Sequence, residues 1–337
     1  MVISIDDDSD MPECLNTWDK QASKAKQLVD LHCNGALAKD VRAPYPQGCF
    51  SRTVIVILQD GKELVVQFRP EPLDLAPFEL ARKTLGELVP EIRRIFDEEL
   101  DQLRFWVYFL TMIPGQTWLA TEKSHEEDIT PALVHSLACV LAKCWLNNDS
   151  TAVVDNQLRQ HLHLIQTSDD PEIRPFSDTA RDLFDKLDSL KALPLFLSHC
   201  DLNAMNIMVE NDRLQVSGLI DWEYSTPLPF GVGLARILTL IGEFRYGEFH
   251  MEDDFEDVER TFWDLLLAKV PESTRTLCLE RPELLQTAMT LGTLFDTFQL
   301  YEGKLGLYNP VAVRALPKLL SYRVPLIRMP EAPPFLV

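Results

Sequence analysis

Four polar side chains that could perform chemistry occur in a part of the chain whose other residues have the character of buried strands. His199, Asp201 and Asn206 have the spacing HxDxxxxN, and Asp221 follows fifteen residues after Asn206, at the end of a second apolar run. A buried carboxylate without a partner is costly in free energy because it loses its hydration. We therefore expect these groups to face a ligand, with a polar turn in an unrelated hairpin as the alternative.

The spacing of these residues indicates how they are brought together. Two apolar segments, separated by the polar turn Glu210-Asn211-Asp212, predict a β-hairpin that places Asn206 and Asp221 at the same end. Amide and carboxylate oxygens are hard ligands of the kind Mg2+ prefers, and such a site leaves other positions for phosphate oxygens and water. Asp201 is then free to accept a proton from a substrate hydroxyl. This division of roles is what phosphoryl transfer requires.

The elements expected before this site form a small α+β lobe. The acidic opening from Asp6 to Asp10 looks like a solvated tail, and a helix follows it. The segments TVIVIL and LVVQFRP, joined at Asp60-Gly61, predict a β-hairpin. A helix that begins near Pro77 and ends before Pro90 comes next, and RFWVYFLTMIPG predicts a buried strand. From Ile129 onward the pattern is mostly helical.

The segments HCDLNAMN and LIDWE resemble the aminoglycoside phosphotransferase and choline kinase superfamily, whose members share a protein-kinase-like fold. The stretches VVQFRP and FLTMIPG look most like the fungal branch, and the resemblance covers roughly residues 48 to 247. It implies an α+β fold of two lobes, one a small antiparallel-sheet lobe and the other larger and mostly helical. We expect a nucleotide-binding lobe with a helical N-terminal extension at 1–115 and a catalytic, substrate-binding lobe at 116–337.

The resemblance also implies a role for each of the four polar residues. Asp201 is expected to be the catalytic base, and Asn206 and Asp221 are expected to be the metal ligands. His199 is expected to stabilise the catalytic loop through hydrogen bonds, and direct participation of His199 in catalysis is the alternative. Trp222 is expected to pack between the lobes, with substrate stacking as the alternative.

Nucleotide-binding residues are expected in the first lobe. The turn from Gly48 to Ser51 is similar to the phosphate-covering loop of the family, although a plain turn has the same composition. The family needs a cation on the following strand, where Gln67 and Arg69 share one face and Arg69 is the basic candidate. Its expected partner is Glu79, with Glu87 as the second candidate and a surface arginine as the alternative reading.

Two further residues, Met112 and Ile113, fall after Thr111 where the interlobe hinge of the family presents backbone groups to adenine. A buried strand would use the same apolar residues. The chain also departs from the family at two positions. Cys200 replaces a usual glycine, which we expect to do little damage, and Gly233 stands where an anchoring Asp is common, which implies a less rigid catalytic loop.

Charge and cysteine content limit the partners and the compartment. Lys and Arg total 32 against 52 Asp and Glu, and the net charge of -20 argues against binding to nucleic acid or anionic membranes. The seven cysteines are scattered without a CxxC pair, which disfavours disulfides and zinc sites. No apolar run is long enough to cross a bilayer, and the acidic start lacks the basic residues of a signal peptide. A cytoplasmic location is expected, and the oligomeric state stays open.

An acidic cluster later in the chain allows two readings. Its members are Asp253, Asp254, Glu256, Asp257 and Glu259. Relatives that phosphorylate amine-bearing substrates place acids against ammonium groups, but a solvated helix face is the preferred reading in so acidic a chain.

The function expected from these features is transfer of the γ-phosphoryl group of ATP, with Mg2+, to a hydroxyl of a small molecule. Amine-bearing compounds and secondary metabolites are the acceptors considered. One alternative is a kinase-like protein that binds nucleotide or metabolite without transfer. Another is activation of the hydroxyl by phosphorylation, followed by elimination or cyclisation.

Overall fold

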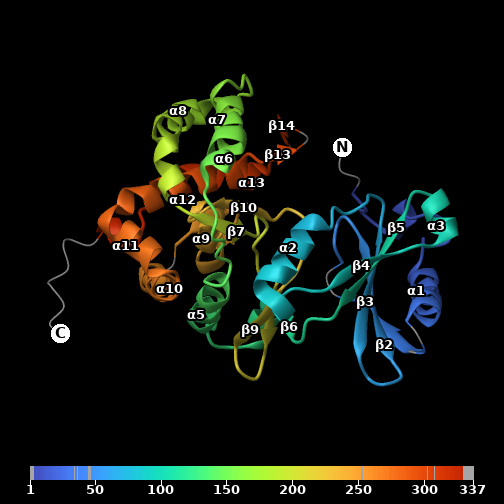
Figure 1. The fold of residues 1–337 in the computed structure, drawn as a ribbon. Coiled ribbons are helices and arrows are strands. Elements are labelled where there is room, and N and C mark those ends of the chain that lie inside the picture. The colour runs from blue at the N-terminus through green and yellow to red at the C-terminus, as the bar shows by residue number, and fades with distance from the viewer. Residues whose placement is uncertain are drawn as a thin grey trace. The chain divides into compact units, whose positions relative to one another are not determined.

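The computed structural model describes residues 4–33, 35, 37–44, 47–251, 253–301, 303–306 and 308–328. The chain forms two compact units, Met1–Pro114 and Gly115–Val337, which are coloured from blue to teal and from green to red in Figure 1. The division lies one residue before the boundary expected from the sequence.

The first unit contains a five-stranded antiparallel sheet with the order β1-β2-β3-β5-β4. Its strands are β1 (Ala38–Arg42), β2 (Arg52–Leu58), β3 (Glu63–Arg69), β4 (Ile92–Ile95) and β5 (Trp106–Thr111). Its helical segments are η1 (Asp8–Asp10), α1 (Trp18–His32), α2 (Ala76–Leu85), η2 (Gly86–Leu88) and α3 (Glu98–Gln102). The predicted β2–β3 hairpin, the helix α2 and the strand β5 are confirmed. The strands β1 and β4 were not predicted.

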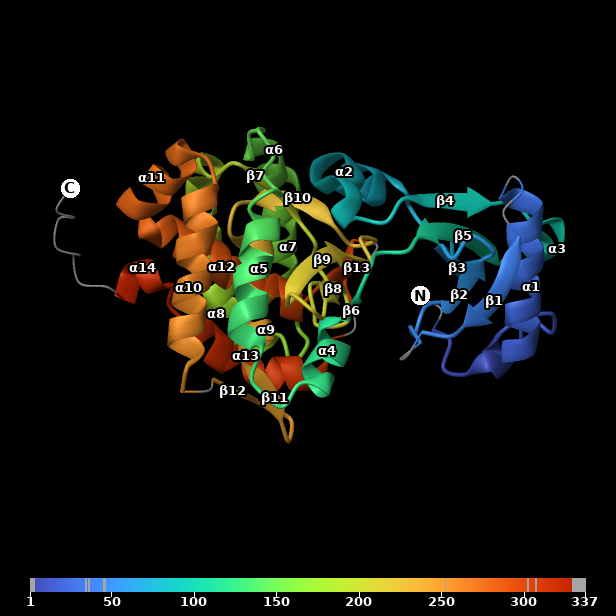
Figure 2. The same ribbon diagram turned by 90° about the horizontal axis from the view of Figure 1, so that it is seen from below.

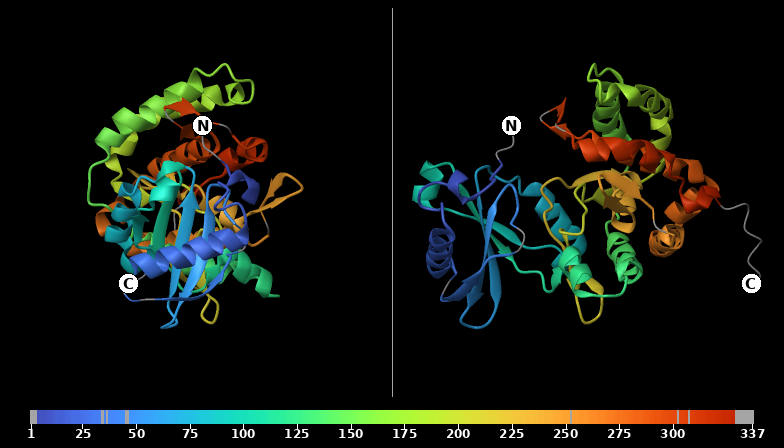
Figure 3. Two further views of the ribbon diagram at one scale, coloured as in Figure 1. Left: turned by 90° about the vertical axis from the view of Figure 1, so that its right-hand side faces the viewer. Right: turned by 180° about the vertical axis from the view of Figure 1, so that it is seen from behind.

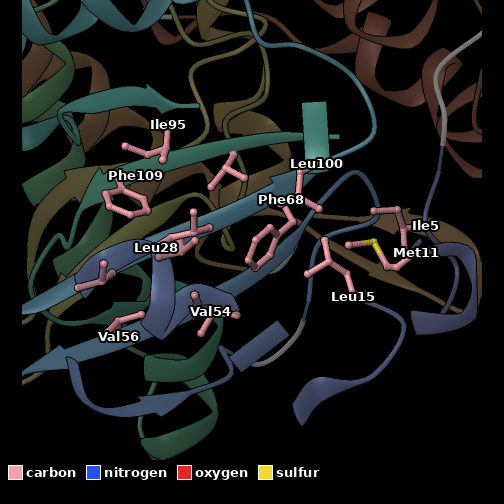
Figure 4. Packing of buried hydrophobic residues seen from close by; sticks show 14 of the residues in the cluster. Ile5, Met11, Leu15, Leu28, Val54, Val56, Phe68, Ile95, Leu100 and Phe109 are labelled. Atoms are coloured by element: carbon pink, nitrogen blue, oxygen red, sulfur yellow. The ribbon is translucent and has the colours of Figure 1, made fainter. Parts of the chain in front are cut away.

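Helix α1 covers one face of this sheet, as the blue helix across the strands in Figure 3 (left) shows. Figure 4 shows the core beneath it, where Leu28 of α1 packs with Val54 of β2 and Phe68 of β3. Val54 and Val56 of β2, and Val66 and Phe68 of β3, are two residues apart along their strands and therefore lie on one face of the sheet. Burial of this apolar face stabilises the unit.

The acidic residues Asp6, Asp7 and Asp10 are exposed, as predicted, but the segment that contains them is not a free tail. Ile5 and Met11, on either side of the acidic residues, are buried in the same core cluster and are labelled in Figure 4. Asp8 forms an ion pair with the buried side chain of Arg52, with 2.7 Å between Oδ1 and Nε. The segment is therefore anchored to the first unit by these apolar residues and by the ion pair of Asp8. The sequence analysis missed the anchoring because its apolar signal consists of single residues outside the acidic run.

The second unit is mostly helical, as predicted. Its helices are α4 (Trp118–Ser124), α5 (Thr130–Leu141), α6 (Thr151–Val153), α7 (Arg159–Gln166), α8 (Ser177–Lys186), α9 (Ile237–Ile241), α10 (Phe255–Lys269), α11 (Glu272–Glu280), α12 (Pro282–Thr297), α13 (Pro310–Ser321) and α14 (Pro325–Arg328). Shorter helical turns are η3 (Val154–Leu158), η4 (Arg174–Phe176), η5 (Leu187–Ala192) and η6 (Val232–Leu234). Helices α5 and α10 pack side by side, as Figures 1 and 2 show. No helix among the described residues is both long and apolar enough to span a bilayer.

Short strands in the second unit hold the segments that contain the polar motif. They are β6 (Gln116–Thr117), β7 (Leu195–Ser198), β8 (Ile207–Glu210), β9 (Gln215–Leu219), β10 (Thr226–Pro229), β11 (Glu243–Arg245), β12 (Glu248–His250), β13 (Leu300–Tyr301) and β14 (Lys304–Leu305). Strands β8 and β9 form the predicted antiparallel hairpin, with Ile207 opposite Leu219. Strand β6 pairs with the other edge of β8, and β7 pairs with β10.

Gly115 allows the chain to enter β6. Its φ angle of 102° lies in the region that favours glycine, and a Cβ atom there would lie 2.1 Å from the carbonyl oxygen of Val209. The close approach of β6 to β8 therefore requires a residue without a side chain at this position.

Candidate active site

The loop between β7 and β8 holds Asp201 through hydrogen bonds from nearby amides. Asn206 Nδ2 donates to the backbone carbonyl of Asp201 at 2.8 Å and to its Oδ2 at 2.9 Å. Asn203 Nδ2 donates to Oδ1 of the same carboxylate at 3.3 Å. Because the amide nitrogen of Asn206 is directed at Asp201, its side-chain oxygen is left to accept or coordinate another group.

The hairpin brings Asn206 and Asp221 to the same end, as predicted from the spacing. The backbone N–H of Ile220 donates to the carbonyl of Asn206 at 2.9 Å, directly before Asp221. Asp221 itself is exposed and has a φ angle of 64°, in the left-handed region. A residue other than glycine in this region costs roughly 1–3 kcal/mol, and such strain concentrates at functional sites. An exposed carboxylate and an amide oxygen at one strand end fit the ligand preference of Mg2+.

His199 connects the loop to the same end of the hairpin. Its Nε2 donates to the carbonyl of Ile220 at 2.8 Å, and its ring lies against Trp222 with 4.6 Å between the ring centroids. Burial lowers the pKa of His199 to about 4, so the ring is neutral near pH 7. This geometry favours the stabilising role over proton transfer.

Trp222 is fully buried in the second unit, and its Nε1 donates to the carbonyl of Leu219 at 2.8 Å. The ring fills the space behind the hairpin end, so Trp222 contributes packing within this unit.

Arg236 contacts Asp201 and was not predicted from the sequence. It precedes α9, and its Nη1 lies 3.5 Å from Oδ1 of Asp201. Its Nε donates to Oδ1 of Asp296 in α12. Burial disfavours the guanidinium charge, but the carboxylates of Asp296 and Asp201 outweigh burial and raise the pKa of Arg236. Burial also raises the pKa of Asp296, against the opposing effect of Arg236. The sequence signal that could have revealed this cluster is Asp296, a single acid in the apolar segment TLGTLFDTF.

Gly233, where the family commonly has Asp, is packed directly against β7. A Cβ atom at this position would lie 2.0 Å from Oγ of the buried residue Ser198. No side chain fits here unless the strand before His199 moves. The packing of this unit therefore has no space for the anchoring Asp that is common at this position.

In the first unit, the loop between β1 and β2 carries the predicted phosphate-covering turn. Gly48 is exposed and Ser51 is buried. Arg52 Nη1 donates to the carbonyl of Gly48 at 3.2 Å, and the backbone N–H of Ile5 donates to the carbonyl of Cys49 at 2.7 Å. The sequence interpretation missed this role of Arg52, which ties the turn to the N-terminal segment.

The other nucleotide-binding candidates of the first unit lie on separate elements. Arg69 is buried at the end of β3, and Gln67 lies two residues earlier, opposite Thr53 of β2. Glu79 is exposed in the first turn of α2. Glu87 lies in η2, and Met112 and the buried Ile113 follow β5.

The acidic cluster divides into two kinds of residue. Asp253, Asp254, Glu256 and Asp257 are exposed, as a solvated face requires. Glu259 is fully buried and accepts a hydrogen bond from the hydroxyl of Tyr322. The solvated reading is therefore wrong for Glu259, because the helix turns this residue toward the interior.

A cavity of about 560 Å3 in the second unit adjoins the loop between β7 and β8. Asn203 and Ala204 of the loop line it, together with residues of α4, α9 and β11. Its acidic side chains are Glu122, Asp128, Glu243 and Asp254, and its basic side chain Arg245 is paired with Glu243 at 2.6 Å. Burial, with the charges of Asp128 and Glu243, raises the pKa of Glu122. The cavity therefore carries a net negative charge, and Asn203 in its lining is two residues away from Asp201.

Residues 42–251 match the sequence model of the Phosphotransferase enzyme family. The chain belongs to this family. The match covers the Gly48 turn, the loop between β7 and β8 and the β8–β9 hairpin, which carry residues of the predicted site. A comparison with curated proteins finds no match.

Solved structures of phosphotransferases share the two-lobed, kinase-like fold of this family member. An ethanolamine kinase from Plasmodium vivax has a TM-score of 0.55 at 13% identity, over 91% of this chain and 85% of that chain. A macrolide 2'-phosphotransferase type I has a TM-score of 0.50 at 16% identity, over 82% and 90%. The aminoglycoside phosphotransferase APH(4)-Ia has a TM-score of 0.50 at 15% identity, over the same shares. At these identities the similarity establishes the fold.

Proposed function

We propose that this family member transfers the γ-phosphoryl group of ATP to a hydroxyl of a small molecule in a Mg2+-dependent reaction. The observation that carries the proposal is the arrangement of three side chains around one hairpin end. Asn206 donates its amide to Asp201, and the hairpin brings Asp221 beside Asn206. In this arrangement the Asp201 carboxylate would accept a proton, and the side-chain oxygens of Asn206 and Asp221 would coordinate an ion.

The oxygens of Asn206 and Asp221 would hold the ion, which neutralises phosphate charge when bound. Asp201 accepts the proton of the acceptor hydroxyl as that oxygen forms its bond to the γ-phosphorus. The bond from this phosphorus to the bridging oxygen breaks, and ADP leaves. His199 keeps the loop and the hairpin end together through its bond to Ile220.

We assign nucleotide binding to the first unit. Gly48 and Ser51 would cover the phosphates. Arg69 would hold the α and β phosphates, with Glu79 as its acidic partner and Gln67 on the same face of the strand. Met112 and Ile113 would present backbone groups to the adenine.

The acceptor proposed here is an amine-bearing alcohol. The cavity beside Asn203 carries four carboxylates against one paired guanidinium, so an ammonium group is favoured there over an anion. The ethanolamine kinase and the aminoglycoside phosphotransferase, by their names, act on compounds of this class.

A second candidate function is binding of nucleotide without transfer. Gly233 favours it, because the packing against Ser198 leaves no room for the side chain that commonly anchors the loop of Asp201 in this family. Transfer followed by elimination or cyclisation is the remaining alternative, and it differs only in the product.

One experiment separates these functions. Thermal shift with ATP and GTP, with and without Mg2+, measures nucleotide binding. ADP release and product mass are then followed over a panel of hydroxylated amines, with matched alcohols that lack the amine as controls. Stable phosphate esters are expected. Nucleotide binding without ADP release for any acceptor would support the binding function instead.

A further inference from the structure

Arg236 lies between two carboxylates that come from distant parts of the second unit. Its Nη1 is 3.5 Å from Oδ1 of Asp201, in the loop after β7, and its Nε donates to Oδ1 of Asp296, near the end of α12. The Asp201, Arg236 and Asp296 side chains are 31%, 21% and 27% exposed. The three groups therefore form one partly buried cluster that a substrate can still reach at Asp201.

The contact with Arg236 differs in kind from the other contacts of the Asp201 carboxylate. Asn203 and Asn206, which donate to the two carboxylate oxygens, belong to the same loop and move with it. Arg236 connects the carboxylate to α12, a 16-residue helix of the unit's interior. Among the described residues, Arg236 is the one outside the loop that forms an ionic contact with the Asp201 carboxylate.

Two structural features of the neighbouring residues bear on how this loop is held. Cys200, the residue before Asp201, has a φ angle of 58°, which is an unfavourable conformation for a residue with a side chain. Gly233 contributes no side chain, and the contact with Ser198 leaves no room for one. Arg236, three residues later, reaches the loop from the following turn.

We propose that Arg236, held by Asp296, is a positioning residue that orients the Asp201 carboxylate for proton acceptance. This inference rests on the proposed phosphotransferase function. A planar guanidinium suits the task because Nε and Nη1 contact one carboxylate each at fixed relative positions. With Oδ1 held, the carboxylate faces the acceptor hydroxyl, whose proton it takes as the O–P bond forms and ADP departs. A displacement of about 1 Å in such a group costs on the order of 100-fold in rate.

The test uses Arg236→Gln, Arg236→Lys and Asp296→Asn in the full chain, with kcat and KM for ATP measured by ADP release. Arg236→Gln is expected to lower kcat by about 10- to 100-fold while KM for ATP stays within about threefold. Arg236→Lys is expected to fall between Gln and wild type, because one ammonium cannot hold both carboxylates in the same geometry. Asp296→Asn should lower kcat less, and the double variant Arg236→Gln/Asp296→Asn should be no slower than Arg236→Gln.

Arg159 offers a matched control in the same unit. Its Nη2 also lies between two carboxylates, 3.4 Å from Asp155 and 2.8 Å from Asp188. Arg159→Gln is expected to leave kcat unchanged, so a general effect of breaking a double ion pair is separated from an effect on Asp201.

Two failures can be told apart. If wild-type ADP release is absent, or is unaffected by Asp201→Asn, the proposed function is wrong and this inference falls with it. If release depends on Asp201 but folded Arg236→Gln keeps wild-type kcat, only the role of Arg236 is wrong. The proposal would also be overturned if Arg236→Gln lost ATP affinity by the same factor as kcat and had a lower melting temperature, and if Arg236→Lys recovered none of these losses. If Arg236→Gln does not fold, Arg236→Lys and Asp296→Asn decide the question.

Discussion

The polar residues of the second unit are joined by hydrogen bonds, whereas the nucleotide-binding candidates of the first unit are spread over separate elements. Asp201, Asn206 and His199 belong to one loop and bond to each other or to the adjoining hairpin. In the first unit, Gly48 lies in a loop, Arg69 on a strand and Glu79 on a helix. The second unit thus holds its proposed reacting groups through contacts between residues that are close in sequence, whereas the proposed nucleotide site of the first unit draws its residues from several elements. Changes in the second unit should therefore affect chemistry most, and changes in the first should affect nucleotide affinity.

The largest effect among these variants is expected at the hairpin end of the second unit. Asp221→Ala removes one of two proposed ion ligands, so turnover should fall by about 1,000-fold or more, and Mg-nucleotide binding should weaken. Steady-state ADP release and calorimetry measure the two effects. Asp212→Ala, in the exposed turn of the same hairpin, is the control and should behave as wild type. Equal behaviour of the two variants would remove Asp221 from the site.

In the first unit, Arg69→Met should mainly raise KM for ATP. Loss of a charge-assisted hydrogen bond to phosphate costs about 1.5–3 kcal/mol, which corresponds to roughly 10- to 100-fold in kcat/KM. Arg42→Met is the control, because Arg42 is an exposed residue of β1 that is paired with Glu63. A fall in kcat without a change in KM would contradict the separation of roles between the two units.

Acid should weaken the second unit through its buried histidines. Burial lowers the pKa of His161 and of His199 to about 4, from an ordinary value of 6.5. The unfolded chain therefore takes up these protons between pH 6.5 and 4 while the native state does not, and stability falls as the pH drops through this range. Each histidine should cost about 2 kcal/mol between pH 7 and pH 5.

Urea unfolding of His161→Phe at pH 7 and pH 5 checks this effect. The variant keeps a ring that can stack on Phe295 but lacks the titrating group, so its loss of stability should be smaller by about 2 kcal/mol. His163→Phe, on the exposed side of the same helix, should lose as much stability as wild type. The same pH dependence in all three proteins would contradict the assignment.

The smallest effect is expected at Cys200. Glycine would relieve a left-handed strain of about 1–2 kcal/mol, but it would also increase the entropy of the unfolded chain by about 0.4–1 kcal/mol. Cys200→Gly should therefore change the free energy of unfolding by less than about 1 kcal/mol, and kcat should stay within about threefold. A destabilisation above about 3 kcal/mol, measured by urea unfolding, would show that the thiol has a larger packing role.

The same contrast explains what the sequence could predict. The β8–β9 hairpin and the loop before it are formed by residues close in sequence, so their spacing and apolar pattern were sufficient to predict them. Strands β1 and β4 were missed because they are the two edges of the sheet. Their sequences AKDVR and IRRI carry the charged residues that protect edges and hide the alternating pattern of a strand.

Contacts between distant segments were not predictable in this way. Arg236 and Asp296 are 60 residues apart, and Arg52 and Asp8 are 44 residues apart. Each pair is formed only when the elements that carry it have packed, so neither residue has a neighbour in sequence that reveals its partner. The resemblance to a family supplied the roles of matching positions, but Arg236 was not among them.

The central claim is that Asp201 accepts the proton while the neighbouring oxygens hold the ion. Asp201→Asn tests it most directly, with ADP release and Mg-ATP affinity measured on the same preparation. The structure predicts that turnover falls by about 100- to 10,000-fold, while the dissociation constant for Mg-ATP changes by less than about threefold. Wild-type turnover in this variant, or a loss of nucleotide binding as large as the loss of turnover, would contradict the account.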